Sequence, residues 1–144
     1  MLHATEKHKA EMISAVIKTA KSRLSGANAK IVSQFLHNYY DNVSPSDLAD
    51  VTPESLFGAA LAHWKLGAQR KPGKALVRVY NPNLEEDGWV SDHTVIEIIN
   101  DDMPFLVDSI TSELNRQELT VHLVIHPVIG LSRAKDGTVE GLVS

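Results

Sequence analysis

The chain has 144 residues, of which 43% are hydrophobic, and a formal net charge of −4 at pH 7. This length predicts one domain, or one small domain with an extension, and the hydrophobic share is enough for a buried core. The absence of cysteine excludes disulfides and thiol chemistry, and the acidic balance gives no general attraction to nucleic acid or to an anionic membrane.

The amino-terminal segment carries no recognisable targeting signal. Its lysines are not followed by the apolar run of a secretory signal, and Glu6 and Glu11 interrupt the pattern of a transit peptide. No apolar run elsewhere approaches the roughly 20 residues of a membrane-spanning helix. We therefore expect a cytoplasmic protein that binds neither a membrane nor nucleic acid.

Residues 1–70 are predicted to be helical. Two stripes of apolar residues at three-to-four spacing predict helices that end near Ser25-Gly26 and near Asp41-Asn42. The third helix has the clearest start, at Thr52-Pro53-Glu54. Thr suits a cap, Pro suits the first position, and Glu favours the positive end of the helix dipole. This helix runs to Gly67.

The tripeptide Lys71-Pro72-Gly73 is the clearest boundary in the chain, because the apolar period changes to two after it. Residues 75–81 and 94–100 are predicted strands, and the acidic loop 85–88 separates them. We therefore expect an amino-terminal helical segment at 1–70 and an α+β domain at 71–144.

A helix and two more strands follow. Pro104 has a fixed φ that suits a first helical turn, so a helix is predicted over residues 104–116 with Asp102 as its N-cap. Alternating apolar residues predict a strand over 119–131, and Pro127 indicates that this strand is an edge. A hairpin turn at Asp136-Gly137 leads to a last strand at 138–143.

These elements predict an α+β fold, in which the amino-terminal helices precede a ferredoxin-like antiparallel sheet. A right-handed crossover makes strands 94–100 and 119–131 parallel, which gives a split β-α-β core. Strand 138–143 fills the gap between them, and strand 75–81 pairs with the far side of 94–100. Helix 104–116 covers one face of the sheet. The other face is left for the amino-terminal helices, a partner, or sequence beyond the last residue, and we expect the sheet to be truncated at its carboxyl end.

The acidic turn before helix 104–116 is the candidate ligand site. Its two carboxylates are placed to hold the ammonium of an amino acid, and the backbone N–H groups at the helix start are placed to hold its carboxylate. The structural alternative is a helix cap in a solvated loop. The candidate ligand-binding residues are Asp101, Asp102, Met103, Pro104 and Phe105.

The histidines are expected to be structural. His122 and His126 share one face of a predicted strand but lie about 13 Å apart at 3.3 Å per residue, which is too far to share a metal ion. His63, beside Trp64, is expected to pack between helices, since no carboxylate or nucleophile accompanies it in the sequence. We therefore assign no catalytic residue and no metal-binding residue.

The charged clusters are also expected to have structural roles. The loop carboxylates Glu85, Glu86 and Asp87 indicate solubility, and Asp108 and Glu113 lie on the polar side of an amphipathic helix. A basic cluster near the domain boundary lacks the interleaved aromatic residues of a nucleic-acid site and could equally face the acidic loop across the hairpin. Its members are Arg70, Lys71, Lys74 and Arg78.

The segment IEIINDDMPFLVDSITSELNRQELTVHLVIHPVIG closely resembles the amino-terminal region of the large bacterial NAD-dependent glutamate dehydrogenases. The upstream segments DLADVTPESLFGAALAHW and ALVRVYNP fit the same region, so the resemblance covers the chain from about Ser44 onward. The block DDMPFLVDS is its most specific part. In that family this region resembles an ACT-type module, a ferredoxin-like fold that often senses amino acids.

The resemblance implies a non-catalytic regulatory or assembly module of a large NAD-dependent glutamate dehydrogenase. The parent reaction would be oxidative deamination of L-glutamate to 2-oxoglutarate and ammonia. NAD would bind elsewhere in the parent, because this chain has no G-x-G-x-x-G after a strand, and we assign it no cofactor-binding residue and no enzymatic activity of its own. The implied partners are downstream domains of the same polypeptide, further copies in a homo-oligomer, and an amino-acid effector.

ACT modules usually carry Asp-x-Pro-Gly between the first strand and the helix. The matching residues here are Asp102, Met103, Pro104 and Phe105, so a phenylalanine replaces the glycine that would let a ligand or second subunit approach the backbone. This departure favours a packing or assembly role. Two alternatives remain, which are a free-standing amino-acid sensor that uses this turn at a dimer interface and a helical protein-interaction module without a ligand.

Overall fold

A computed structural model of the chain describes residues 5–143, apart from the side chain of Ala27. Its helices are α1 (Glu6–Arg23), α2 (Gly26–Tyr39), the 3-10 helix η1 (Pro45–Leu48), α3 (Pro53–Gly67), α4 (Leu84–Asp87) and α5 (Leu106–Arg116). Its strands are β1 (Leu76–Tyr80), β2 (Val95–Ile99), β3 (Leu131–Arg133) and β4 (Val139–Leu142). The predicted α+β class is confirmed. The predicted helical segment at 1–70 and the predicted domain at 71–144 also include residues 1–4 and Ser144, which lie outside the described residues.

The main hydrophobic core lies among the amino-terminal helices. The predicted cap of α3 is present, since Thr52 Oγ1 accepts from Ser55 N at 3.2 Å. Thr5 caps α1 in the same way, because its Oγ1 accepts from His8 N at 3.1 Å. The Tyr40 hydroxyl donates to the Leu56 carbonyl at 2.6 Å inside this core. The most deeply buried large side chains come from α1, from α2 and its C-cap residue, and from η1: Val16, Leu36, Tyr40 and Leu48.

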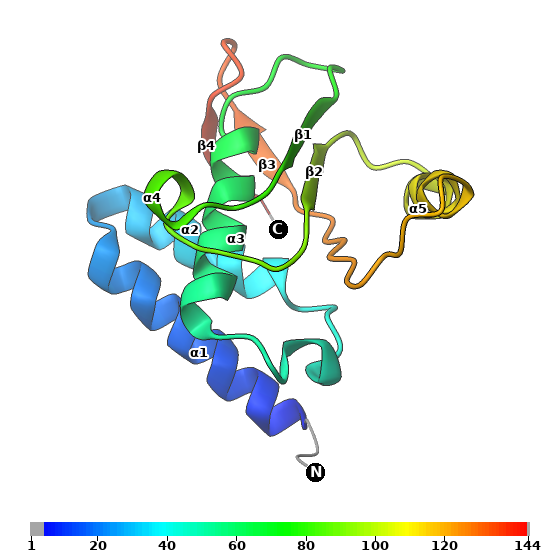
Figure 1. Ribbon diagram of the computed structural model, residues 1–144. Helices are drawn as coiled ribbons and strands as arrows, with labels where there is room; N and C mark the ends of the chain where they lie inside the picture. Colours follow the sequence, from blue (N-terminus) through cyan, green and yellow to red (C-terminus); the bar gives the residue numbers. More distant parts are fainter. Residues whose placement is uncertain (1–4, 144) are drawn as a thin grey trace.

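Strands β1 and β2 pair antiparallel and form a layer on these helices (Figure 1). The inner face of the pair packs on α3, where a Cβ added to Gly67 would lie 3.1 Å from Ile99 Cδ1. The outer face is apolar and open to solvent, with Val77 63% and Val79 62% exposed opposite Ile98 and Ile96. The predicted strands at 75–81 and 94–100 are therefore confirmed.

Strands β3 and β4 form the predicted hairpin, with Gly137 at a φ of +92° in its turn. The hairpin docks on the carboxyl end of α3. Arg70 N donates to Gly137 O at 3.1 Å, and Val139 N donates to Ala68 O at 3.0 Å. These bonds join two segments that are about seventy residues apart in the sequence.

The predicted pairing of all strands in one sheet was wrong for the described residues. The strands form two separate two-stranded sheets, β1–β2 and β3–β4, so β4 does not lie between β2 and the following segment. Of the strand predicted over residues 119–131, only Leu131 is paired, as the first residue of β3. Residues 125–129 still alternate between half-buried and exposed, because Ile125 and Ile129 pack on the helical core. This packing holds the segment against the core, while no described strand pairs with it.

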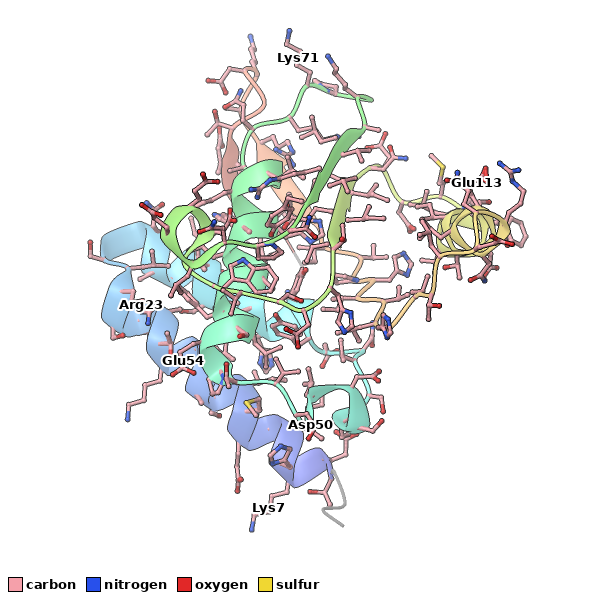
Figure 2. The ribbon with its side chains drawn as sticks, viewed as in Figure 1. Lys7, Arg23, Asp50, Glu54, Lys71 and Glu113 are labelled. Atoms are coloured by element: carbon pink, nitrogen blue, oxygen red, sulfur yellow. The ribbon has the colours of Figure 1, made fainter. Side chains whose placement is uncertain are left out.

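The predicted start of helix 104–116 was also wrong. Helix α5 begins at Leu106, and its N-cap is Phe105 rather than Asp102. The acidic loop at 85–88 is instead a single turn, α4, which Asn83 caps by accepting from Glu85 N at 2.8 Å. Figure 2 shows that α5, which carries Glu113, lies on the opposite side of the molecule from α1, which carries Lys7 and Arg23.

Within residues 5–143, no helix is both long enough and apolar enough to cross a membrane.

Candidate functional site

The acidic turn predicted as a ligand site has an irregular backbone. Asp101 N donates to the Asn100 side chain at 2.9 Å, and Asp101 Oδ1 accepts from Arg70 Nη1 at 3.0 Å. Met103 and Phe105 are 46% and 76% exposed. The turn thus uses Asp101 to hold Arg70, and it presents two large apolar side chains to solvent.

Phe105 adopts the left-handed backbone conformation, with φ +62° and ψ +13°. This is the position where the ACT pattern has glycine, and the conformation explains that preference because only glycine adopts it without a Cβ clash. The phenylalanine side chain gains little from burial here, so the backbone strain is not offset by packing.

Replacing Phe105 with glycine is expected to stabilise the turn. The relief of left-handed strain is about 1 kcal/mol, reduced by the larger entropy of glycine in the unfolded chain. Amide hydrogen exchange at the start of α5, for example at Ser109, should slow by a few-fold in Phe105→Gly. A matched Phe105→Ala variant should show no such gain, and equal exchange in both variants would contradict the strain argument.

The turn forms one wall of a cavity of about 580 Å³. The cavity lies between the end of β2 and residues 125–129, and residues from the carboxyl ends of α2 and α3 also line it. Asp101 and Asp102 line one side, whereas Pro104 and Phe105 do not reach it. Its other walls are mostly apolar and include Trp64, Ile98, Ile99, Ile125 and Ile129.

A buried hydrogen-bond chain forms part of this cavity wall. His63 Nδ1 lies 2.9 Å from the Tyr39 hydroxyl, and His63 Nε2 lies 3.2 Å from the Ile98 carbonyl. With Nε2 protonated, the ring donates to Ile98 O and accepts from Tyr39, so the neutral tautomer satisfies both contacts. Burial lowers the pKa of His63 and raises the pKa of Tyr39, which keeps both groups neutral.

The lowered pKa of His63 predicts a loss of stability in mild acid. In the unfolded chain the ring gains its proton near pH 6.5, but burial resists protonation in the folded state, so the stability from His63 is present above pH 6.5 and lost as the pH falls through the folded pKa. The difference in unfolding free energy between the wild type and His63→Gln should therefore shrink from pH 7.5 to pH 5.5. Gln34→Ala, at an exposed position of α2 without an ionisable side chain, is the control and should give a constant difference. A constant difference for His63→Gln as well would contradict this assignment.

A second polar group lies on the inner face of the β1–β2 pair. Arg78 pairs with Asp87 at 3.0 Å and lies 3.7 Å from Glu97, whose side chain is buried. Tyr80 donates to Glu97 Oε2 at 3.2 Å, and burial raises the pKa of both Glu97 and Tyr80, the latter to about 12. The basic cluster therefore does face the acidic segment at 85–88 through Arg78, as the sequence suggested. The geometry is that of a structural ion pair.

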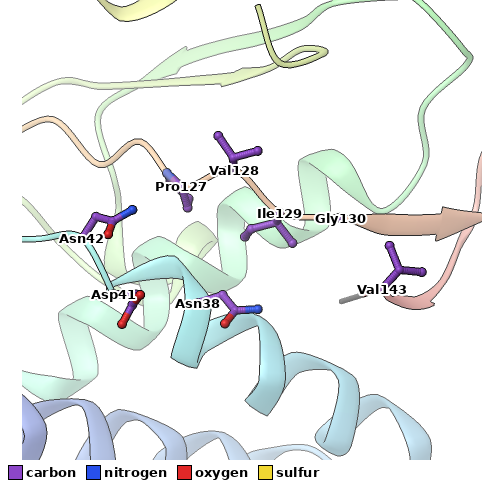
Figure 3. Close-up of a pocket in the computed structure, with 8 residues that line it drawn as sticks. All are labelled: Asn38, Asp41, Asn42, Pro127, Val128, Ile129, Gly130 and Val143. Atoms are coloured by element: carbon purple, nitrogen blue, oxygen red, sulfur yellow. The ribbon is translucent and has the colours of Figure 1, made fainter.

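A smaller cavity of about 330 Å³ lies at the end of α2 (Figure 3). Asn38, Asp41 and Asn42 face the segment from Pro127 to Gly130 across it, and Val143 lies beside Gly130. A Cβ on Gly130 would lie 2.8 Å from Val143 Cγ2, so the chain is closely packed at that point. This cavity marks where β4 meets the extended segment.

The remaining predicted residues are not brought together. The His122 ring stacks on His93 with centroids 4.0 Å apart. Asp108 is exposed, and Glu113 pairs with Arg116 on the outside of α5. Within the described residues, no group of three or more metal-ligating side chains is positioned to hold an ion.

The sequence did not indicate the roles of two polar residues that line the cavity and bond to its walls. His63 was expected to pack between helices, but it also bonds to the β2 backbone, and Arg70 is a largely buried residue whose Nη2 has no hydrogen-bond partner in the part of the chain that is described. For His63, the one available signal was its place beside Trp64 in the apolar stripe of a predicted helix, where a polar side chain needs a buried hydrogen-bond partner.

Comparison with known proteins gives consistent matches. Residues 35–144 match the family described as the glutamate dehydrogenase ACT1 domain. The chain is 39% identical over 145 residues to the NAD-specific glutamate dehydrogenase of Halomonas elongata, which covers 100% of the chain and 9% of that protein. It is 33% identical over 112 residues to the NAD-specific glutamate dehydrogenase of Pseudomonas aeruginosa, covering 78% of the chain and 7% of that protein. The chain thus spans less than a tenth of the length of these curated relatives, and no solved structure matches it.

Proposed function

Because this chain belongs to the glutamate dehydrogenase ACT1 domain family, we propose that it is a non-catalytic regulatory and assembly module of a large NAD-dependent glutamate dehydrogenase. The parent enzyme would convert L-glutamate to 2-oxoglutarate and ammonia in the cytoplasm. NAD and the reacting groups would be held by other domains of the same polypeptide. The helical segment at 1–70 and the ACT-like unit at 71–144 would act together as one end of that enzyme.

The apolar surface on one side of the described chain supports an assembly role. The outer face of the β1–β2 pair is open, and α5 is strongly amphipathic yet has no buried residue. The apolar stripe of α5 consists of Leu106, Val107, Ile110 and Leu114, all partly exposed. Apolar faces of this kind on a stable chain commonly mark contacts with other protein surface. In the proposed enzyme those contacts are with downstream domains and with further copies in a homo-oligomer.

Two measurements test this function. An antibody raised to the chain should detect a band far above 15.8 kDa in the source cells. Val79→Lys in that long polypeptide should change its oligomeric mass or its response to effectors while glutamate-dependent turnover at saturation stays within a few-fold. Leu84→Lys, at an exposed position of α4 outside the β1–β2 pair, is the control. Glutamate-dependent NADH formation by the 144-residue chain alone would contradict the proposal.

A second candidate is amino-acid sensing at the Asp101–Phe105 turn. It is favoured by one observation, namely that Asp101 and Asp102 line the 580 Å³ cavity. Calorimetry with a panel of amino acids should then give saturable heat that disappears in Asp102→Ala. The absence of heat with every amino acid would count against a sensor.

A further inference from the structure

The cavity beside β2 contains two arginine side chains that the functions above do not use. Arg70 follows α3, Arg133 is the last residue of β3, and both line the cavity. They bond to one carbonyl, since Arg70 N donates to Gly137 O at 3.1 Å and Arg133 Nη1 donates to the same oxygen at 2.8 Å. The hairpin turn therefore holds the Arg133 guanidinium beside Arg70. We call these two residues the arginine pair.

The Arg70 guanidinium has one donor group without an acceptor. The side chain is only 9% exposed, and its Nε donates to Lys74 O at 2.6 Å. Nη1 donates to Asp101 Oδ1 at 3.0 Å, whereas Nη2 is buried and has no partner among the described residues. A buried donor without an acceptor is costly, and the Nη1–Nη2 edge of a guanidinium fits both oxygens of one carboxylate. Asp101 uses only half of that edge.

Arg133 adds a positive charge that no described side chain balances. It forms no ion pair within residues 5–143, and its one side-chain hydrogen bond there is to Gly137 O. Burial, and after it the charge of Arg70, lower the pKa of Arg133, although a guanidinium keeps its proton in proteins. The two charges of the arginine pair thus share a single carboxylate, that of Asp101, within the described part of the chain.

The other walls of the cavity suit an apolar molecule. The space of about 580 Å³ lies in the range of small-molecule sites, which combine apolar walls with a few charged groups. Its polar wall residue His63 is already bonded through both ring nitrogens. The apolar lining comes from α3, from β2 and from the segment before β3, and includes Trp64, Ile98, Ile99, Ile125 and Ile129.

We propose that the arginine pair binds the carboxylate of a small organic acid whose apolar body lies in this cavity. The carboxylate would replace Asp101 on Arg70 Nη1 and would also accept from Nη2, while Arg133 supplies the second positive charge. Asp101 can leave at little cost, because its side chain is 63% exposed and exposed ion pairs contribute little. The inference concerns this cavity and does not depend on the function proposed for the parent enzyme.

The role of Asp101 distinguishes this site from an amino-acid sensor at the acidic turn. In the sensor, the carboxylates of Asp101 and Asp102 attract the ammonium of the ligand, so loss of either charge weakens binding. At the arginine pair, Asp101 competes with the ligand for Arg70, so loss of its charge strengthens binding. The two sites therefore predict effects of opposite sign for Asp101→Asn.

Equilibrium dialysis of the complete native polypeptide tests the charge of the ligand. The probes are isocaproate and isohexylamine, which have the same carbon skeleton and opposite charges. Isocaproate should bind saturably and isohexylamine should not. Absence of saturable isocaproate binding up to about 10 mM would overturn the proposal. Binding to the 144-residue chain but not to a longer native polypeptide would also overturn it, because the parent would then cover the cavity.

A pair of charge-removing variants tests the role of Arg133. Arg133→Gln should weaken isocaproate binding by about tenfold or more, as expected for the loss of a charge that acts on a bound anion. Lys135→Gln removes the same charge at an exposed position of the same hairpin and should leave binding within about twofold. Equal effects of the two variants would overturn the proposal, and so would binding that Arg133→Gln leaves unchanged, since it would belong to another site.

Asp101→Asn provides a test that leaves the hairpin intact, whereas Arg133→Gln also removes the bond to Gly137 O. Because an exposed ion pair is weak, isocaproate should bind about twofold to fivefold more tightly in Asp101→Asn. Unchanged or weaker binding of isocaproate in this variant would overturn the proposal. Saturable binding of isohexylamine that Asp101→Asn weakens would assign the cavity to a cation, with the same consequence.

Discussion

Replacing Leu36 with alanine is expected to lower the free energy of unfolding by about 3–4 kcal/mol, within the range for buried leucines. Leu36 is fully buried in α2, in the core that α1, α2, η1 and α3 share. The loss combines the burial free energy of the three carbon groups that are removed with the cost of a cavity that the surrounding helices cannot fully close. Domain stability is typically about 5–15 kcal/mol, so this single change removes a large share of it.

Urea unfolding followed by circular dichroism would measure this loss for Leu36→Ala. The control is Leu84→Ala, which makes the same chemical change at a site that is 67% exposed and should shift the unfolding free energy by less than about 0.5 kcal/mol. Similar losses for both variants would mean that the helical core does not dominate the stability of the chain.

Replacing Gly137 with alanine is expected to cost about 3–4 kcal/mol, or to detach the hairpin from α3. The residue has a φ of +92°, and a Cβ there would lie 2.2 Å from the Arg70 carbonyl oxygen. That neighbour is backbone and cannot rotate away, so overpacking of about 1–3 kcal/mol adds to left-handed strain of about 1–2 kcal/mol. The hydrogen bond from Arg70 N to Gly137 O would be lost with the contact.

Gly73→Ala is the matched control for this prediction. Gly73 also has a positive φ, +73°, but nothing lies within 4 Å of an added Cβ, so only the strain of about 1 kcal/mol remains. Unfolding free energies of the two variants, together with exchange of the Val139 amide that bonds to Ala68, would separate the two effects. Equal destabilisation would show that the contact with Arg70 is not closely packed.

Residues that act on their own backbone were predictable from the sequence. Thr52, Pro53 and Glu54 start α3 as expected, and the Asp136-Gly137 pair makes the expected hairpin turn. These outcomes follow because caps, fixed φ values and left-handed turns are decided within a few residues. The resemblance carried by the DDMPFLVDS block was likewise sufficient to indicate the family, which the matches confirm.

The start of α5 shows where local rules were misleading. Asp102 and Pro104 both suit a helix start, yet the helix begins at Leu106 behind a left-handed Phe105. The neighbouring Asp101 accepts from Arg70, which follows the carboxyl end of α3 and lies 31 residues earlier in the sequence. Such a choice depends on a partner that is distant in sequence, so no pattern around residue 102 could have revealed it.

By itself, the sequence determined the order and type of the main elements, their caps and turns, and the family to which the chain belongs. Only the tertiary structure decided that the helices and strands share one core, since His63, Gly67 and Ile125 join them through contacts between distant segments. It also decided that the described strands form two separate pairs, β1–β2 and β3–β4. Strand pairing is a contact between backbones, and backbone groups are the same in every residue, so side-chain patterns specify a strand without specifying its neighbour.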